Sequence, residues 1–219
     1  MNRISIILVL LLSGIVACNN VADKRKLNIY GNPQVVEKTV DGKIVYDTVD
    51  HTVGYFRLFN QDSTVITPKD LEGKVYVADF FFTSCISICP EMSKQMLRVH
   101  DQFKDRDSLQ LVSFSIDPDY DTVAVLKNYS ERLGVTSDKW HFLTGDEDEI
   151  YSLAFNSYLT ERPADDPEDE NNILHSGAFI LIDTKKRIRG VYDGTVPDQV
   201  DILMKDINNL LNEENEGNS

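Results

Sequence analysis

The fold is decided by one stretch, Val75-Tyr76-Val77-Ala78-Asp79-Phe80-Phe81-Phe82-Thr83-Ser84-Cys85-Ile86-Ser87-Ile88-Cys89-Pro90. Its first eight residues are almost all apolar, which is typical of a strand buried on both faces. Pro90 suits the start of a helix, where the missing N–H group leaves no partner unsatisfied. The stretch therefore predicts a buried strand, a helix, and between them a loop that presents two thiols as soft metal ligands or as a redox pair.

Strands and helices alternate along most of the chain, which predicts an α/β fold with helices packed on a central sheet. Before this pattern begins, the Asp41-Gly42 pair predicts a β-hairpin over 35–49. The predicted strands cover residues 53–59, 75–82, 109–116, 140–143, 177–183 and 187–193, and the predicted helices cover 90–104, 121–133, 147–157 and 198–212, the last with Ile202, Leu203, Ile207, Leu210 and Leu211 on its apolar face.

The N-terminus predicts export from the cytoplasm. Arg3 precedes an apolar run from Ile4 to Val16, which is shorter than the roughly 20 residues of a spanning helix. The sequence Ile15-Val16-Ala17-Cys18 resembles the lipobox of bacterial lipoproteins; an uncleaved anchor or an ordinary secretory signal is the alternative. The resemblance implies a periplasmic domain anchored to a membrane by lipidated Cys18. The expected units are a signal peptide (1–17), a lipidated N-terminus and linker (18–34), the domain (35–213) and a polar tail (214–219).

The formal charge of the 219-residue chain is −14 at pH 7, which argues against nucleic acid as a partner. A domain of this size buries a core without disulfides, so its cysteines are free for chemistry. The acidic stretch 161–170 contains two prolines and predicts a solvated loop. A role of this loop in gating the site or binding a basic partner is the alternative.

The cysteine pair itself permits two kinds of chemistry. With Pro90 as the first helical residue, Cys89 is the expected N-cap, where the helix dipole favours a thiolate. The spacing from Cys85 to Cys89 is one residue wider than the Cys-x-x-Cys of thiol–disulfide enzymes. This wider spacing eases metal chelation, and it also permits a disulfide.

Asp79 lies in the apolar strand, six residues before Cys85. The pattern Asp-Phe-x-x-x-x-Cys resembles thioredoxin-like proteins, in which a buried acid exchanges protons with the first cysteine. A buried carboxylate with a purely structural role is the equal alternative, because a buried acid needs hydrogen-bond partners in either case.

A copper site built on two thiolates would need a third donor, such as an imidazole or a thioether. His175 is the candidate, because it immediately precedes the apolar strand over 177–183. In thioredoxin-like redox enzymes the loop that enters this strand faces the cysteine loop and carries a cis-proline, which this segment lacks. The remaining candidates are interpreted as packed or surface residues, namely His51, His100, His141, Met92 and Met96.

These features make the chain similar to the Sco/SenC family, the thioredoxin-like copper chaperones of cytochrome c oxidase assembly. The resemblance covers most of the chain from Val53 onward. It rests on four ordered motifs: Asp79 to Pro90; Ser115-Ile116-Asp117-Pro118-Asp119-Tyr120-Asp121-Thr122; Trp140-His141-Phe142-Leu143-Thr144-Gly145; and His175-Ser176 before Phe179-Ile180-Leu181-Ile182-Asp183.

The resemblance implies a thioredoxin-like fold with a central mixed sheet, here extended by the N-terminal hairpin. It also implies one copper ion, Cu(I) or Cu(II), held by Cys85, Cys89 and His175. The chain would deliver copper to the CuA centre of an oxidase subunit, or would reduce cysteines of that centre or of other exported proteins through Cys85 and Cys89. Many family members have proline where Ile86 stands, so we expect a more mobile loop.

Asp117 and Asp121 match an Asp-Pro-x-x-Asp turn of the family. We interpret this turn mainly as a cap of the helix that follows it. A supporting role beside the metal ligands, shared with Asp79, is the alternative.

Overall fold

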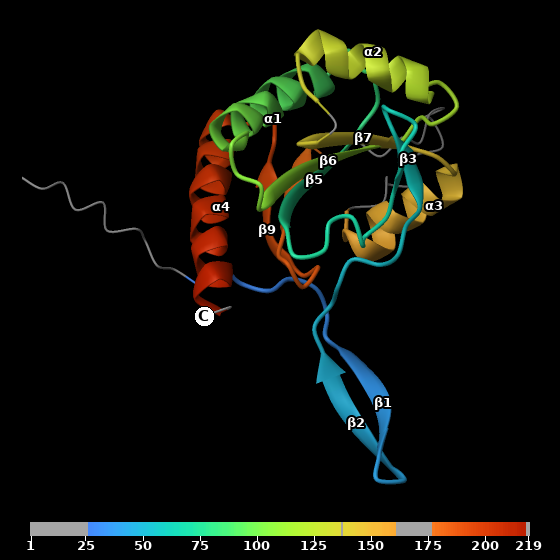
Figure 1. Ribbon diagram of the computed structural model, residues 1–219, viewed down its shortest axis with the longest axis vertical. Coiled ribbons are helices and arrows are strands. Elements are labelled where there is room, and N and C mark those ends of the chain that lie inside the picture. Colours follow the sequence, from blue (N-terminus) through green and yellow to red (C-terminus); the bar gives the residue numbers. More distant parts are fainter. Residues whose placement is uncertain (1–25, 137, 161–176, 218–219) are drawn as a thin grey trace, which may run out of the picture.

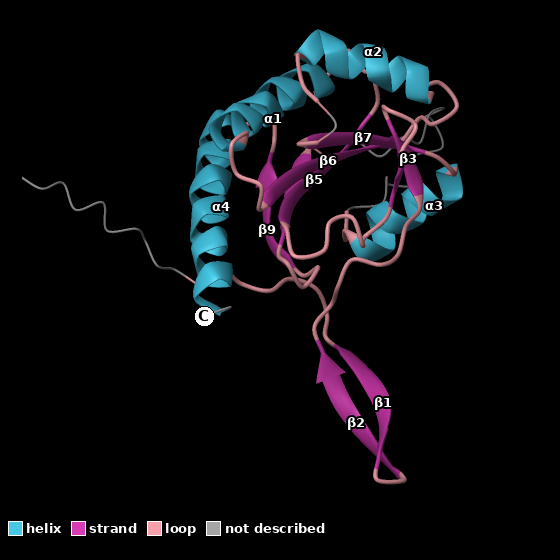
Figure 2. Ribbon diagram, viewed as in Figure 1, coloured by secondary structure: helices cyan, strands magenta, loops and turns pink. Residues whose placement is uncertain are grey.

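The centre of the protein is a mixed β-sheet (Figure 1; Figure 2). The computed structural model describes residues 26–136, 138–160 and 177–217. Within these residues the sheet has seven strands in the order β4-β3-β7-β6-β5-β8-β9. Strands β5, β6 and β7 are parallel, whereas β8 runs antiparallel to β5. The elements are β1 (Gln34–Val40), β2 (Lys43–Val49), β3 (Leu58–Asn60), β4 (Val65–Ile66), β5 (Val75–Phe81), α1 (Cys89–Phe103), β6 (Leu109–Ser115), α2 (Val123–Leu133), β7 (Trp140–Thr144), α3 (Glu147–Ser152), the π-helical turn η1 (Leu153–Ser157), β8 (Ala178–Ile182), β9 (Ile188–Asp193) and α4 (Pro197–Gly217).

Helices cover both faces of this sheet (Figure 2). Helices α1, α2 and α4 lie over one face, where their apolar side chains pack on the central strands. Helix α3 and η1 lie over the other face, together with the segment that precedes β3. Because both faces are covered, all seven residues of β5 are buried. The predicted mixed sheet between helices is confirmed.

The central elements agree with the sequence analysis, and the peripheral ones differ from it. Val53 and Phe56 pack in the core without joining a strand and Tyr55 is exposed, so β3 begins only at Leu58. The helix predicted over 147–157 is α-helical to Ser152 and then becomes the π-helical turn. Ile202, which was assigned to the apolar face of the last helix, is 40% exposed.

The hairpin of β1 and β2 projects from the rest of the protein, as Figure 1 shows. Asp41 and Gly42 have φ angles of +52° and +75°, as the tight turn predicted from this pair requires. Side chains on both strands are exposed, for example Val35 at 69% and Tyr46 at 72%. The N-terminal hairpin extension is therefore confirmed, and it adds little to the core.

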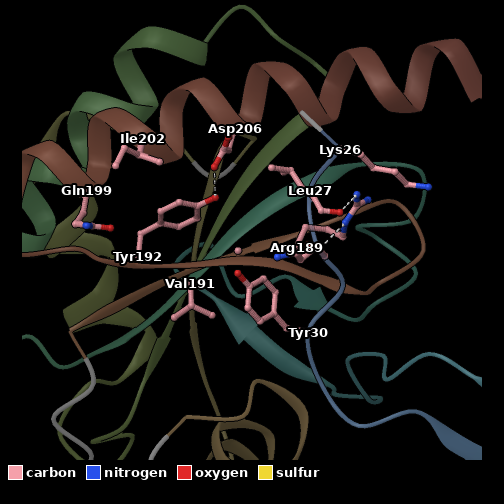
Figure 3. Close-up of a pocket in the computed structure, with 11 residues that line it drawn as sticks. Lys26, Leu27, Tyr30, Arg189, Val191, Tyr192, Gln199, Ile202 and Asp206 are labelled. Carbon is pink, nitrogen blue, oxygen red and sulfur yellow. Dashed lines mark hydrogen bonds between the residues drawn. The ribbon is translucent and has the colours of Figure 1, made fainter. Parts of the chain in front are cut away.

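Residues 26–30, which the sequence analysis assigns to a linker, pack on the domain. Leu27 is buried, and the N–H group of Tyr30 donates a 2.9 Å hydrogen bond to a carbonyl oxygen at the start of β9. The buried guanidinium of Arg189 donates hydrogen bonds to the carbonyl oxygens of Leu27 (2.9 Å) and Asn28 (3.1 Å). Leu27, Tyr30 and Arg189 line a cavity between this segment, β9 and α4 (Figure 3), which has a volume of about 210 Å³.

Candidate metal centre

The two cysteines lie at the end of the sheet formed by the carboxyl ends of the parallel strands. Strand β5 ends at Phe81 and α1 begins at Cys89, so Cys85 lies in the loop between them. Because β5 and β6 are parallel, the segments that follow them meet at the same edge. The turn from Asp117 to Asp121, which follows β6, therefore lies near the thiol loop.

Both thiols are free, and the surroundings of Cys85 favour its thiolate. Burial raises the pKa of Cys85, but hydrogen bonds from the Cys89 thiol, the Ser87 hydroxyl and the N–H groups of both residues outweigh burial. The pKa of Cys85 consequently lies below its ordinary value. Its Sγ atom is 3.5 Å from Oγ of Ser87. Cys85 is therefore suited to bind a soft metal or to attack a disulfide.

Cys89 behaves differently from the sequence interpretation, which placed it at the N-cap and favoured its thiolate. The N-cap is Ile88, and Cys89 is the first residue of α1. Burial, the shared hydrogen bond with Cys85 and the charges of Cys85 and Asp79 raise the pKa of Cys89 to about 12. Removal from water thus outweighs the helix dipole at this position, and without a metal the proton stays on Cys89.

Asp79 is buried in β5 and belongs to a chain of hydrogen bonds. The Ser113 hydroxyl donates to its carboxylate, and the indole N–H of Trp140 donates to the Ser113 oxygen over 2.8 Å. Burial raises the pKa of Asp79 to about 7, although the Ser113 bond opposes this shift. The carboxyl group therefore has the partners that a buried acid needs, and its charge acts on Cys89.

The two acids of the Asp-Pro-x-x-Asp turn have different surroundings. Asp117 is half-buried, and burial together with the Asp121 charge raises the pKa of Asp117. Asp121 is fully buried, and its carboxylate accepts hydrogen bonds from Thr83 and Ser115. The interpretation of Asp121 as a helix cap is wrong, because the hydroxyl of Thr122 caps α2.

The chain that enters β8 reaches the thiol loop. A Cβ atom on Gly177 would lie 4.0 Å from Cδ1 of Ile88 and 3.4 Å from Cγ2 of Thr195. This approach follows from the sheet, because β8 is antiparallel to β5 and so begins at the edge where β5 ends. His175, the predicted third ligand, precedes Gly177 by two residues and lies outside the described residues. Cys18 and the acidic loop 161–170 also lie outside them.

The other three histidines are packed away from the thiols. The Nε2 atom of His51 hydrogen-bonds with the carbonyl oxygen of Ser157 over 2.8 Å. The ring of His100 lies 6.2 Å from that of Trp140, and burial lowers the pKa of His141 to about 4. Across the part of the chain that the structure describes, His, Cys, Asp and Glu side chains form no group of three that could hold a metal ion. Met92 and Met96 of α1 lie in the core, which confirms their interpretation as packed residues and not thioether ligands.

Sequence reasoning missed the hydroxyl groups that support the acids. Ser113 and Ser115 alternate with apolar residues in the fully buried strand β6, so both point to the same face of the sheet. This pattern is a usable signal, because a polar residue in a buried strand needs a hydrogen-bond partner. Thr83, which supports Asp121, and Ser87, which contacts the Cys85 sulfur, lie in the loop and carried no such signal.

The sequence pattern of the SCO1/SenC family matches residues 45–212. The chain belongs to the SCO1/SenC family. The matched range runs from β2 into α4 and contains Cys85, Cys89 and His175.

Solved structures of Sco proteins resemble this one over nearly their whole length. A SCO1/SenC family lipoprotein from Bacillus anthracis str. Ames is 29% identical, with a TM-score of 0.65 that covers 74% of this chain and 95% of the other. BsSco, described as a member of the Sco family of cytochrome c oxidase assembly proteins with a disulfide switch, is 30% identical, with a TM-score of 0.62 covering 73% and 93%. ScoI from Arabidopsis thaliana with copper bound is 26% identical, with a TM-score of 0.59 covering 74% and 99%. The predicted thioredoxin-like fold is confirmed.

No helix within the described ranges is long and apolar enough to cross a membrane.

Proposed function

We propose that this Sco protein is an extracytoplasmic copper chaperone that delivers copper to the CuA centre of a respiratory cytochrome c oxidase. Copper is its cargo, held one ion per chain by the sulfur atoms of Cys85 and Cys89 and by the imidazole of His175. Soft thiolates with an imidazole suit Cu(I), and the same donor set accepts Cu(II). The copper-bound ScoI structure and the description of BsSco as an oxidase assembly protein support this proposal.

One observation carries the assignment of His175. A Cβ atom on Gly177 would lie 4.0 Å from the side chain of Ile88, the residue before Cys89, so the segment that follows His175 reaches the thiol loop. Two residues of extended chain span at most about 7 Å, which keeps His175 within reach of the loop. The third ligand thus comes from a segment 86 positions beyond Cys89 in the sequence.

Copper retention tests the ligand set. The purified chain, reduced and loaded under anaerobic conditions, should retain about one copper ion and protect both thiols from alkylation. His175→Ala and Cys85→Ser should each lose most of the metal. His100→Ala is the matched control, because His100 lies eleven residues along α1 from Cys89, roughly 16 Å away. Undiminished retention in His175→Ala would remove this histidine from the site.

A second candidate function, thiol–disulfide reduction, is favoured by the opposite pKa shifts of the two cysteines. In this reaction the Cys85 thiolate attacks a target disulfide, which forms a mixed disulfide and releases one target thiol. Cys89 gives up its proton and attacks Cys85, which releases the second target thiol and leaves a Cys85–Cys89 disulfide. The target is reduced by two electrons, and the pair is oxidised by two.

His175 distinguishes the two functions. A pure reductase should keep its rate of disulfide reduction in the His175→Ala variant, because no step of that reaction uses the imidazole. A copper chaperone should lose its metal in the same variant. Loss of both properties would indicate that copper handling and thiol exchange share this histidine.

We also propose that Cys18 carries a lipid that anchors the domain to a membrane of the cell envelope, on the periplasmic side. The Ile15-Val16-Ala17-Cys18 sequence and the Bacillus anthracis lipoprotein support this proposal. A labelled fatty acid should be incorporated into the chain and not into its Cys18→Ser variant. Equal labelling of both would rule out the anchor at Cys18.

A further inference from the structure

The thiol loop is held at its start by one buried carboxylate. Oδ2 of Asp121 accepts a 2.9 Å hydrogen bond from the N–H group of Thr83, and Oδ1 accepts a second bond from the Thr83 hydroxyl. Thr83 is two residues before Cys85, and its partner lies 38 positions further along the chain. These bonds connect the turn after β6 to the loop after β5.

Asp121 is itself fixed from two sides. Its Oδ2 atom accepts a 2.6 Å hydrogen bond from the Ser115 hydroxyl at the end of β6. Its backbone N–H group donates a 2.8 Å hydrogen bond to the carbonyl oxygen of Asp117. The side chain is 0% exposed, so water does not compete for the carboxylate. The carboxylate is thus a rigid point against which Thr83 is placed.

The rest of the loop has less support. Ile86, directly after Cys85, is 95% exposed. The N–H group of Cys85 donates a long 3.3 Å hydrogen bond to the carbonyl oxygen of Phe82 within the loop. The backbone direction at Thr83 therefore has a large influence on where the Cys85 sulfur lies relative to Cys89.

We propose that Asp121 is a positioning residue for the thiol pair: through Thr83 it fixes the loop so that the Cys85 sulfur lies beside Cys89. The role follows from the hydrogen bonds of Asp121 and needs no contact between Asp121 and copper or a target disulfide. It deepens the proposed function, because either metal binding or thiol exchange requires the two sulfur atoms at a set separation.

The Asp121→Asn variant tests the proposal. It keeps the shape of the side chain but replaces one accepting oxygen with an NH₂ donor, which opposes the donors of Thr83 or Ser115. Copper affinity, measured by competition with a chelator, should fall by about 10- to 100-fold, as for other residues that orient metal ligands. In the copper-free protein, the equilibrium constant for the Cys85–Cys89 disulfide in glutathione buffers should change by a similar factor.

Variants at Thr83 test the same hydrogen bonds in case the Asp121→Asn variant does not fold. Thr83→Val removes the hydroxyl bond to the carboxylate and keeps the N–H bond, so we expect a loss of roughly 10-fold, typical of one hydrogen bond to a charged group. Thr83→Ser keeps both bonds and should behave as the wild type. Thr136→Val is the matched control, because it removes an exposed Thr136–Asp138 bond at the opposite edge of the sheet and should leave both readouts unchanged.

The outcomes separate this inference from the proposed function. A wild-type chain that binds no copper would overturn the chaperone assignment, and the disulfide equilibrium would still report on Asp121. A wild-type chain that binds copper, with unchanged affinity and disulfide equilibrium in Thr83→Val and in a folded Asp121→Asn, would overturn the positioning role. Loss of both properties in Thr83→Ser would also overturn it, because that variant retains both bonds.

Discussion

The two ends of the sheet hold their buried charged groups in different ways. At the thiol end, the Asp121 carboxylate is held by hydroxyl and N–H groups of Thr83 and Ser115. At the opposite end, the Arg189 guanidinium is held by two carboxylates, 3.2 Å from Asp183 and 3.0 Å from Glu213. The Arg189 guanidinium also donates hydrogen bonds to the carbonyl oxygens of Leu27 and Asn28 in the N-terminal segment.

This difference separates stability from chemistry. The ionic cluster around Arg189 joins β9, α4 and residues 26–30, and Arg187 is a second cation beside the buried Asp183. The thiol end combines hydrogen bonds from uncharged donors to the Asp121 carboxylate, a buried Asp79 and a nearly fully exposed Ile86. We infer that the end opposite the thiols contributes more to the free energy of unfolding than the thiol end does. The thiol end is less stabilised, and its sulfur atoms are reactive.

The largest expected effect comes from breaking the ionic cluster. Arg189→Met should lower the free energy of unfolding by about 3 to 5 kcal/mol, because it removes one of the two arginines that pair with buried Asp183 and leaves the carbonyl oxygens of Leu27 and Asn28 without their donor. Urea denaturation measures this change. Arg98→Met is the matched control: its ion pair with Asp201 is partly exposed and should contribute less than about 1 kcal/mol. Equal losses in the two variants would contradict the comparison.

A second test uses the pH dependence of the thiol end in the metal-free protein. Burial raises the pKa of Asp79 to about 7 in the folded chain, from an ordinary value of 3.8. The folded state therefore binds this proton more tightly than the unfolded chain does. The stabilisation of the folded state by this proton is complete below pH 3.8 and is lost as the pH rises to about 7. At ~1.4 kcal/mol per pH unit, this interval corresponds to on the order of 4 kcal/mol.

Asp79→Asn should remove this part of the pH dependence. The free energy of unfolding of the variant minus that of the wild type should be larger at pH 8 than at pH 4. The variant is thus stabilised relative to the wild type as the pH rises. Urea denaturation of both proteins at the two pH values gives the difference. If the difference between wild type and variant is the same at both pH values, Asp79 does not ionise in this range.

The smallest effects come from removing one apolar side chain at each end. Leu27→Ala should cost about 2 to 3 kcal/mol, because Leu27 is the residue of the docked N-terminal segment that is buried in the core. Ile86→Ala should change stability by less than about 0.5 kcal/mol, since Ile86 is in solvent. Thermal unfolding of the two variants measures both changes. A large loss in Ile86→Ala would show that the thiol loop is packed more tightly than its exposure indicates.

The sequence predicted the central elements well, because their signals are local. The apolar run before the cysteines indicated β5, and Pro90 indicated the start of α1, which begins at Cys89. The Asp41-Gly42 pair indicated the hairpin turn. Residues 53–57 and Ile202 were wrongly assigned, because apolar side chains there pack or stay exposed according to neighbours that are distant in the sequence.

The pKa order of the cysteines was not predictable from local signals. Helix position suggested a thiolate at Cys89, but burial and the charges of Cys85 and Asp79 keep the proton on it. The support of the loop by Asp121 was equally hidden, since its partner Thr83 is 38 positions away. Both features depend on which segments meet at the end of the sheet.

The sequence by itself determined which chemistry is available: two thiols after a buried strand, a distant histidine and two acidic turn residues. Its local periodicity also determined most of the sheet and its helices. Only the tertiary structure decided which sulfur atom is the better thiolate and which carboxylate holds the loop. The physical reason is that pKa values and buried hydrogen bonds depend on desolvation and on neighbours that folding brings together from separate strands.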